Sequence, residues 1–238
     1  MGARNRFFLE ASQSCLRGDE AKHCARVFRH QVGDEIEVFS GDGGYSVARI
    51  TAIGSGVVQI EKISDHHKEP PTNITIAPAL LKGKAFETII RKACEVGARQ
   101  IIPLQVEHCV VRIKPDEFAK KREKWERIAI EAAKQCGITH LPKIWEPQSL
   151  EEFVERDESD LKLVAALLDD TRPLHKIVEG RSFDAATVAI GPEGDFQPEE
   201  VAFLAERGYQ PLDLGPNVLR ADTAAIHALS ILSYEATR

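Results

Sequence analysis

Two glycine-containing segments in the last third of the chain could hold a small ligand. They are residues 191–196 (GPEGDF) and 214–220 (LGPNVLR), and each follows a segment that predicts a strand. In open parallel sheets, ligands bind beyond the carboxyl ends of the strands, which is where both segments would lie. Because glycine has no side chain, the backbone there could approach a ligand closely and read the edge of an adenine ring.

The glycine spacing argues against a ligand that carries phosphates. Neither the GxGxxG pattern of a dinucleotide site nor the GxxxxGK[ST] pattern of a phosphate loop occurs in the chain, and Glu193 would repel a pyrophosphate. An adenosine compound without phosphates fits better, and S-adenosylmethionine is such a compound. Spacing alone leaves open that both segments are ordinary turns between a strand and a helix.

The first third of the chain predicts a small β domain. Short strands at residues 36–39, 45–50 and 57–63 are separated by glycine turns, a pattern typical of a small barrel or sandwich. Residues 64–71 are polar and end in two prolines, so they are the best candidate for a linker.

Beyond the candidate linker, strand and helix patterns alternate, which indicates a parallel α/β sheet. Strands are predicted at residues 74–77, 101–104, 161–168, 187–190 and 212–214. Helices are predicted at residues 85–96, which Gly97 stops, at 116–136, which Asp116 caps, from Pro198 to Gly208, and at 221–234.

The charge distribution permits an RNA partner. The net charge is −6, but residues 69–127 hold 12 basic against 8 acidic side chains, whereas residues 128–238 hold 10 against 20. Contact with RNA phosphates needs a locally basic surface and not a basic chain. The distribution is therefore compatible with RNA binding without requiring it.

Composition also bounds the compartment and the cofactors. No apolar run reaches the roughly 20 residues that cross a bilayer, and the charged N-terminus lacks the apolar region of a signal peptide. The five cysteines (Cys15, Cys24, Cys94, Cys109 and Cys136) are scattered and form no CxxC pair, which argues against disulfides and a zinc site. We therefore expect a cytoplasmic protein with no membrane partner and no metal.

Five groups of residues, in order along nearly the whole chain, resemble the RsmE family. Its members are SPOUT-class methyltransferases that act on uridine N3 in 16S ribosomal RNA of the small subunit. The matching groups are His23 with residues 26–29 (RVFR) and Gly33-Asp34, residues 82–84 (KGK) with 92–97 (KACEVG), residues 132–137 (AAKQCG), residues 191–194 (GPEG), and Leu214-Gly215 with residues 218–224 (VLRADTA).

The resemblance implies an α/β fold class with two domains. Residues 1–68 would form a PUA-like, RNA-binding β-barrel, and residues 74–238 a SPOUT-type α/β domain with a C-terminal trefoil knot around a parallel sheet. It also implies S-adenosylmethionine as the methyl donor, bound in a bent form at the knot. The expected partners are a second copy of the chain and small-subunit ribosomal RNA, either free or in the assembled subunit.

The sequence departs from the family pattern at four places. Asp195 stands where a second glycine usually follows GPEG, Ile138 replaces a common arginine, and Ala221-Asp222 replaces the usual Thr-Glu. Residues 168–170 (LDD) also differ. The aspartates keep the loops polar, so donor binding is still expected, whereas the change at Ile138 puts one RNA or dimer contact in question.

The resemblance and the glycine segments together give the candidate site residues. For donor binding these are Leu168, Ile190, Gly191, Pro192, Glu193, Gly194, Leu214, Gly215, Val218, Leu219, Thr223 and Ala224. Glu193 could accept a hydrogen bond from the donor or cap the next helix, and the structural, helix-capping role is favoured. For RNA contact they are Arg6, Arg26, Arg29, Lys82, Lys92, Arg112 and Gln135.

Arg220 is the candidate for the chemistry itself. Uridine N3 carries a proton at neutral pH, and a guanidinium stays charged, so Arg220 cannot be an ordinary general base. It could instead stabilise the uracil anion through O2 or O4, or steer a phosphate. The alternative is a structural ion pair with Asp222 or Glu193. The sequence identifies no general base.

Two other functions stay open. A methyltransferase that acts at a pyrimidine carbon would need a cysteine nucleophile, for which only Cys136 and Cys109 lie near the motifs, without an evident activating partner. A non-catalytic RNA-binding module of ribosome assembly would need the barrel and the basic surface but no donor pocket, and the glycine segments count against it.

Overall fold

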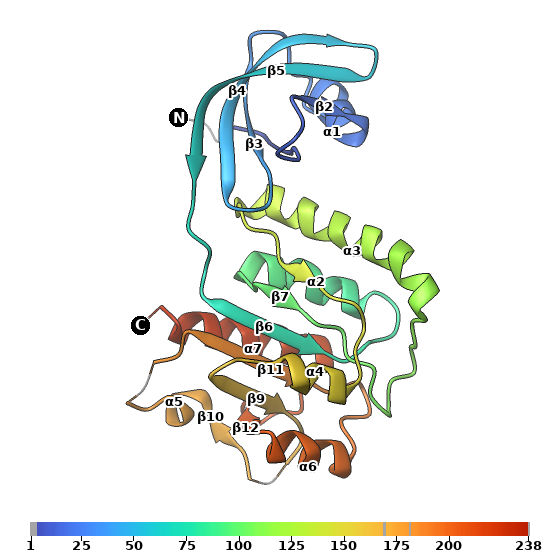
Figure 1. The fold of residues 1–238 in the computed structure, drawn as a ribbon, viewed down its shortest axis with the longest axis vertical. Helices are drawn as coiled ribbons and strands as arrows, with labels where there is room; N and C mark the ends of the chain where they lie inside the picture. The colour runs from blue at the N-terminus through green and yellow to red at the C-terminus, as the bar shows by residue number, and fades with distance from the viewer. Residues whose placement is uncertain (1–3, 169, 181, 238) are drawn as a thin grey trace. The chain divides into compact units, whose positions relative to one another are not determined.

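A computed structural model describes residues 4–168, 170–180 and 182–237. The chain forms two compact units (Figure 1). The N-terminal unit is Met1–Pro70 with Ile130–Leu141, and the C-terminal unit is Pro71–Ala129 with Pro142–Arg238. Asp169, one of the departures from the family pattern, lies outside the described residues.

The N-terminal unit is built on one five-stranded sheet. Its order is β1 (Arg6–Phe8), β3 (Glu35–Phe39), β4 (Gly44–Gly54), β5 (Val57–His67) and β2 (Cys15–Arg17). β1 runs parallel to β3, and the other pairs are antiparallel. In the described part of the chain β1 and β2 remain edges and do not pair, so the expected barrel is a half-barrel.

One expectation for this unit is wrong. Residues 64–67, taken as linker, continue β5, because their backbone pairs with β4 from Val47 opposite Ser64 to Gly44 opposite His67. Almost all side chains at this end of β5 are exposed, so they are polar without breaking the strand. The two short helical elements that follow β2, α1 (Gly18–Lys22) and η1 (His23–Val27), were not predicted.

Residues 130–141, which complete the N-terminal unit, form backbone hydrogen bonds with the turn between β3 and β4. The amide of Gly43 donates to the Thr139 carbonyl at 3.0 Å, and the amide of Leu141 donates to the Gly41 carbonyl at 2.9 Å. At Gly43 a side chain would be strained, because φ is +103°, and its Cβ would displace the His140 ring, which lies within 2.6 Å. The predicted glycine turn between β3 and β4 is therefore also the place where residues 130–141 pack against the half-barrel.

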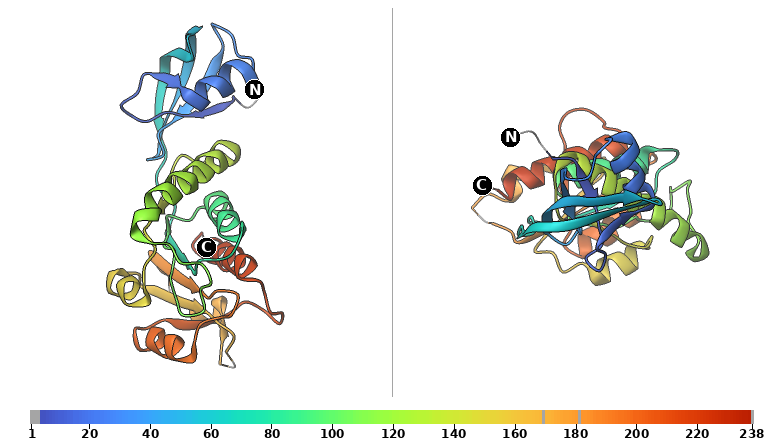
Figure 2. Two further views of the ribbon diagram at one scale, coloured as in Figure 1. Left: turned by 90° about the vertical axis from the view of Figure 1, so that its right-hand side faces the viewer. Right: turned by 90° about the horizontal axis from the view of Figure 1, so that it is seen from above.

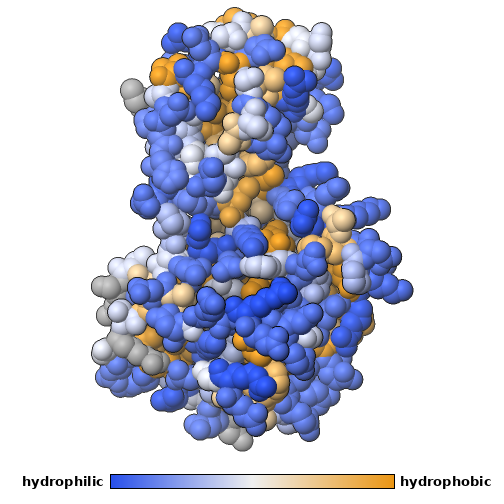
Figure 3. All heavy atoms as spheres, in the orientation of Figure 1, coloured by the Kyte–Doolittle hydropathy of each residue, from blue (hydrophilic) through white to orange (hydrophobic). Residues whose placement is uncertain are grey.

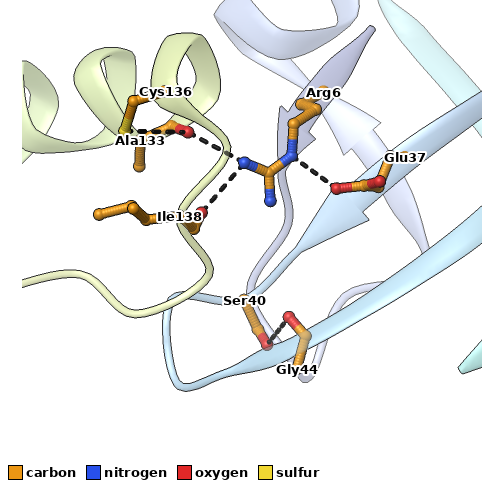
Figure 4. Close-up of polar contacts among 7 residues, drawn as sticks. All are labelled: Arg6, Glu37, Ser40, Gly44, Ala133, Cys136 and Ile138. Carbon is orange, nitrogen blue, oxygen red and sulfur yellow. Dashed lines mark hydrogen bonds and ion pairs between the residues drawn. The ribbon is translucent and has the colours of Figure 1, made fainter. Parts of the chain in front are cut away.

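Arg6 joins the two parts of this unit (Figure 4). Its Nε donates to the Glu37 carboxylate at 2.6 Å, and its Nη1 donates to the carbonyls of Ala133 and Ile138 at 3.0 and 3.1 Å. The side chain of Arg6 is only 10% exposed. The guanidinium also lies over the Phe39 ring. Arg6 thus adds a second donor to the Ala133 carbonyl, which also accepts from the Gly137 amide at 3.0 Å, and supplies a donor to the Ile138 carbonyl just beyond the helix.

The C-terminal unit contains a seven-stranded sheet in which every pair is parallel. The strand order is β10 (Arg172–Pro173), β12 (Gln210–Asp213), β9 (Leu161–Ala165), β11 (Ala185–Ile190), β6 (Asn73–Pro78), β7 (Gln100–Ile101) and β8 (Lys143–Ile144). The predicted parallel α/β sheet is confirmed.

Helices cover both faces of this sheet (Figure 2). α2 (Ala85–Val96) and α7 (Ala221–Glu235) pack together on one face, and α4 (Leu150–Arg156) and α6 (Pro198–Glu206) lie on the other. The short α5 (Leu174–Ile177) contacts α7. Because both faces are covered, the central strands are apolar throughout, and residues 186–190 of β11 are all buried.

Most predicted elements of this unit occur, with shifts at their ends. α2 matches the predicted residues 85–96 and ends at Gly97, whose φ of +95° is left-handed. The long helix α3 (Pro115–Cys136) begins one residue before Asp116, which lies in its first turn. β9 ends at Ala165, three residues earlier than predicted, and β7 covers only Gln100–Ile101. Apolar runs predicted these strands but not where backbone pairing stops.

The last helix returns across the sheet. After β12, which is separated from β6 by β9 and β11, the chain enters α7, and α7 packs against β6, β11 and α2. A knot would require in addition that the chain pass through a loop, and the knot stays a prediction.

The surface is largely polar. On the face shown in Figure 3, hydrophilic residues cover most of the area and hydrophobic residues reach it in small groups. Within the described residues, no helix has the length and apolar character needed to cross a membrane.

Arg6→Ala should lower the free energy of unfolding by about 2–4 kcal/mol, because it leaves Glu37 and the Ile138 carbonyl without the donor that Arg6 supplies in a partly buried place, and removes one of the two donors to the Ala133 carbonyl. Urea unfolding measures this loss. Arg26→Ala is the control, since Arg26 is exposed and should change stability by no more than about 0.5 kcal/mol. Equal stability of the two variants would mean that the Arg6 contacts contribute nothing.

Candidate functional site

A cavity of about 640 Å³ lies at the carboxyl ends of three neighbouring strands. It is bordered by the segments after β9, β11 and β12, and by residues that connect β6 to α2. β11 and β6 are adjacent, and the chain goes from β11 to β12 on one side of this pair but from β6 to β7 on the other, so the direction of the connections reverses between them. Such a switch point is where ligands bind in open α/β sheets.

The segment after β11, residues 191–196, is here named the glycine loop. Gly191 is buried, and a Cβ on it would lie 2.8 Å from Asp195 Oδ1 and 3.1 Å from the Phe196 nitrogen. The sequence suggested that glycine here lets a ligand approach the backbone. The structure gives another reason, because the space that a side chain would need is filled by the loop's own atoms.

Glu193 holds the glycine loop to the segment that enters α2. Its Oε1 accepts a hydrogen bond from the backbone amide of Lys82 at 3.2 Å. The helix-capping role favoured for Glu193 is not observed, because α6 begins after Gln197, which is its N-cap residue. Glu193 instead makes a different structural contact, with the segment that enters α2.

The segment after β12 forms the opposite wall of the cavity. Gly215 has φ of +101°, which only glycine adopts readily, and its amide donates to Asp213 Oδ1 at 2.7 Å. Val218 is 76% exposed although it lines the cavity. An apolar side chain left in water at a cavity wall offers surface that an apolar ligand group could bury.

Arg220 lies at the N-cap position of α7 and lines the cavity. Within the part of the chain that the structure describes, its side chain makes neither a hydrogen bond nor an ion pair, so the alternative of a structural pair with Asp222 or Glu193 is not observed. A cation without a partner at a cavity wall is available to an anionic group of a ligand.

The charges around the cavity have both signs. Glu193, Asp195, Asp213 and Asp222 contribute carboxylates, whereas Lys82 and Arg220 contribute cations. The apolar part of the lining includes Leu81, Ile190, Leu212, Leu214 and Leu219. The site is therefore suited to a ligand with an apolar ring and both a positive and a negative group.

Most of the expected donor-binding residues line this cavity. They are Leu168, Ile190, Gly191, Pro192, Glu193, Leu214, Gly215, Val218, Leu219 and Ala224. Gly194 and Thr223 do not: a Cβ on Gly194 would face His108 at 3.3 Å, and Thr223 is exposed in the first turn of α7. Their contact with a donor stays a prediction.

Several lining residues were not expected from the sequence. Leu81 comes from the connection between β6 and α2, Ala85 begins α2, residues 165–167 lie at and just beyond the end of β9, and Asp213 and Asn217 flank Gly215. Each follows a strand end, which is the general signal for such a site. Only the strand order shows that these ends are neighbours.

The residues expected to contact RNA are in different settings. Arg26 and Arg29 are exposed and, among described residues, have no ion-pair partner, and Lys82 is exposed at the cavity. Lys92 pairs with Glu95 at 2.7 Å, and Arg112 donates to the Glu107 carbonyl at 3.3 Å. Gln135 is exposed near the end of α3. The guanidinium of Arg6 is engaged by Glu37 and by the carbonyls of Ala133 and Ile138. Contact of all these residues with RNA stays a prediction.

The cysteine alternative gains no support. Cys109 is buried, and burial raises the pKa of its thiol, so it stays protonated at neutral pH and is a poor nucleophile. Cys136 is exposed but is not among the residues that line the cavity. Ile138, which replaces a common arginine, contributes its backbone carbonyl to Arg6, a contact that does not depend on the side chain.

Comparison with known proteins identifies both parts of the chain. A family model described as an RNA methyltransferase domain matches residues 68–233, and one described as an RNA methyltransferase PUA domain matches residues 16–63. The "Ribosomal RNA small subunit methyltransferase E" of Bacillus subtilis is 31% identical over 237 residues, with 95% of this chain and 91% of the relative covered. That of Synechocystis is 35% identical, with 86% and 67% covered.

Solved structures with a similar fold cover nearly the whole chain. A methyltransferase from Legionella pneumophila, solved in complex with the bound cofactor S-adenosylmethionine, has a TM-score of 0.90 and 31% identity, and 98% of each chain is covered. An rRNA methyltransferase from Porphyromonas gingivalis has a TM-score of 0.84 and 28% identity, again with 98% of each chain covered.

Gly191→Ala should destabilise the protein by about 1–3 kcal/mol, because the added methyl group overlaps Asp195 Oδ1 and crowds the Phe196 amide. Thermal or urea unfolding provides the measurement. Gly54→Ala is the matched control, since a Cβ there meets no atom within 4 Å and its φ is not positive. If both variants were equally stable, the tight packing inside the glycine loop would be refuted.

Proposed function

The chain belongs to the RsmE family of RNA methyltransferases, and from this premise we propose that it transfers a methyl group from S-adenosylmethionine to N3 of a uridine in 16S ribosomal RNA. The observation that carries the proposal is the cavity where β9, β11 and β12 end. Small-subunit ribosomal RNA, free or in the assembled subunit, is the proposed substrate.

The cavity fits the donor in size and in chemistry. Its volume of about 640 Å³ lies within the roughly 300–1,000 Å³ typical of small-molecule sites. Ile190, Leu214 and Leu219 provide an apolar lining for an adenine ring, and Asp213 and Asp222 provide negative charge for the positive groups of the donor. Free backbone groups of the two glycine segments would give the hydrogen bonds that distinguish adenine from other rings.

The side chains of the site act by holding and by charge stabilisation. When bound, S-adenosylmethionine supplies an electrophilic methyl group. Arg220 would bind the uracil through O2 or O4 and favour loss of the N3 proton, because a nearby cation stabilises the resulting anion. The walls of the cavity would hold the reactants, and such positioning contributes roughly 7–11 kcal/mol to catalysis.

RNA would be held by exposed cations of both units. We propose residues 1–68 as the RNA-gripping domain, with Arg26 and Arg29 as phosphate contacts, and residues 74–238 as the catalytic domain, with Lys82, Lys92 and Arg112 as further contacts. The exposure of Arg26, Arg29 and Lys82 supports this assignment. Gln135 is a candidate contact to the RNA as well. A homodimer in the cytoplasm completes the proposal.

Donor binding and product analysis test the function together. The purified protein should bind S-adenosylmethionine in a calorimetric titration, and incubation with small subunits from a strain that lacks the gene should produce 3-methyluridine, detected by nucleoside mass spectrometry. Binding of RNA without donor binding at millimolar concentration would favour the non-catalytic RNA-binding module instead.

Arg220→Ala should leave donor affinity nearly unchanged and reduce methylation by about 100-fold or more, because it removes charge stabilisation that matters only during the reaction. Arg156→Ala, an exposed arginine of α4 outside the cavity lining, should keep wild-type turnover. Cys136→Ser should also stay active, and its inactivity would favour the cysteine mechanism. Unchanged turnover of Arg220→Ala would remove this residue from the mechanism.

A further inference from the structure

Asp195 connects three chain segments that are distant in sequence. Its Oδ2 accepts a hydrogen bond from the backbone amide of Leu167 at 2.7 Å. Its Oδ1 accepts one from the amide of Phe196 at 2.9 Å, and its carbonyl oxygen lies 2.9 Å from Nδ1 of His108. The three segments follow β9, β11 and β7, so Asp195 joins the chain beyond three strands of the sheet.

Two of these segments form walls of the cavity. Leu167 and Leu168 line it on the β9 side, and the glycine loop lines it on the β11 side. β9 ends at Ala165, and Leu167 is 66% exposed, so apolar burial does little to fix this segment beyond the strand. The hydrogen bond from Leu167 to Asp195 is therefore a principal contact that sets the spacing between the two walls.

The outer side of the glycine loop is fixed as well. His108 donates from Nδ1 to the Asp195 carbonyl, and its Nε2 lies 2.6 Å from the side-chain nitrogen Nε2 of Gln197, which donates to it. Both contacts are satisfied by the neutral imidazole with its proton on Nδ1. The amide of Glu107 also donates to Glu200 Oε1 at 2.8 Å. The loop backbone at Asp195 is thus anchored before any ligand binds.

The backbone of Asp195 indicates that its side chain is required. Its φ is +58°, and among the described residues only Arg29 and Ser55 share a positive φ without being glycine. Glycine would adopt this conformation at lower cost. The carboxylate also occupies the space beside Gly191, so the loop is shaped around it.

We propose that Asp195 is a positioning residue for donor binding: its carboxylate holds the segment after β9 against the glycine loop, so that both cavity walls are formed before the donor enters. The inference rests on the proposed function of the cavity. A preformed site binds its ligand more tightly, because the conformational entropy of ordering its walls is not lost during binding.

Two variants separate positioning from stability. Asp195→Gly and Asp195→Asn both accept a positive φ, but only asparagine keeps an oxygen that can accept from Leu167. Asp195→Gly should weaken binding of S-adenosylmethionine and S-adenosylhomocysteine by about tenfold or more, and raise the donor KM, since a hydrogen bond to a charged group is lost. Its thermal midpoint without donor should be close to that of the wild type. Asp195→Asn should stay within about threefold in affinity.

A donor-free measurement keeps the inference distinct from the function. Hydrogen–deuterium exchange should show faster exchange of the Leu167 amide in Asp195→Gly than in the wild type or in Asp195→Asn. Glu199→Gln, an exposed charge-removing change at the start of α6, is the control for loss of negative charge and should leave exchange and affinity unchanged.

The outcomes are separable. If the wild type binds no donor, the function and the inference both fail. If the wild type binds donor but Asp195→Gly binds it equally well, only the positioning role is overturned. Equally weak binding by the glycine and asparagine variants would also overturn it, because charge and not the hydrogen bond would then be the cause.

Discussion

Backbone pairing of β11 with β9 on one side and β6 on the other is the constraint on which the site depends. These pairs run in parallel register over five and six residues, and the side chains of residues 186–190 are buried. Since β12 pairs on the other side of β9, the segments that follow β9, β11 and β12 all begin at the carboxyl ends of neighbouring strands. A shift of one residue in this register would turn the buried side chains of β11 to the opposite face.

Polar contacts between the loops beyond the strand ends hold the walls of the cavity together. The glycine loop is bound to Lys82 through Glu193, to Leu167 through the Asp195 side chain, and to His108 through the Asp195 backbone. These are contacts between loop and loop, and the buried Phe196 also anchors the glycine loop in the core. A rigid sheet thus carries the loops that line the cavity, and the packing inside the glycine loop contributes to stability as well.

The sequence predicted the α/β sheet, the helices α2, α3 and α7, and most of the cavity lining, because apolar periodicity and glycine position are local signals. It did not predict that β5 extends to His67, since exposed polar residues can pair as well as apolar ones. It assigned Arg6 to RNA and did not show its contacts with residues 133 and 138, because those contacts join residues 127 and 132 positions apart in the sequence. Likewise, the polarity of Asp195 was visible from the sequence, but its bond to Leu167 depends on strand order.

Because residues 130–141 belong to the N-terminal unit, a single cut in the gene cannot separate the two units. The unit is not contiguous: the chain leaves it after Pro70 and re-enters it within α3. A single cut between the two parts would leave the half-barrel without the partners of Arg6 and Gly43, and would leave the catalytic part with the end of a helix that belongs elsewhere. Exchange of this half-barrel for that of a relative would therefore have to include residues 130–141 together with residues 1–70.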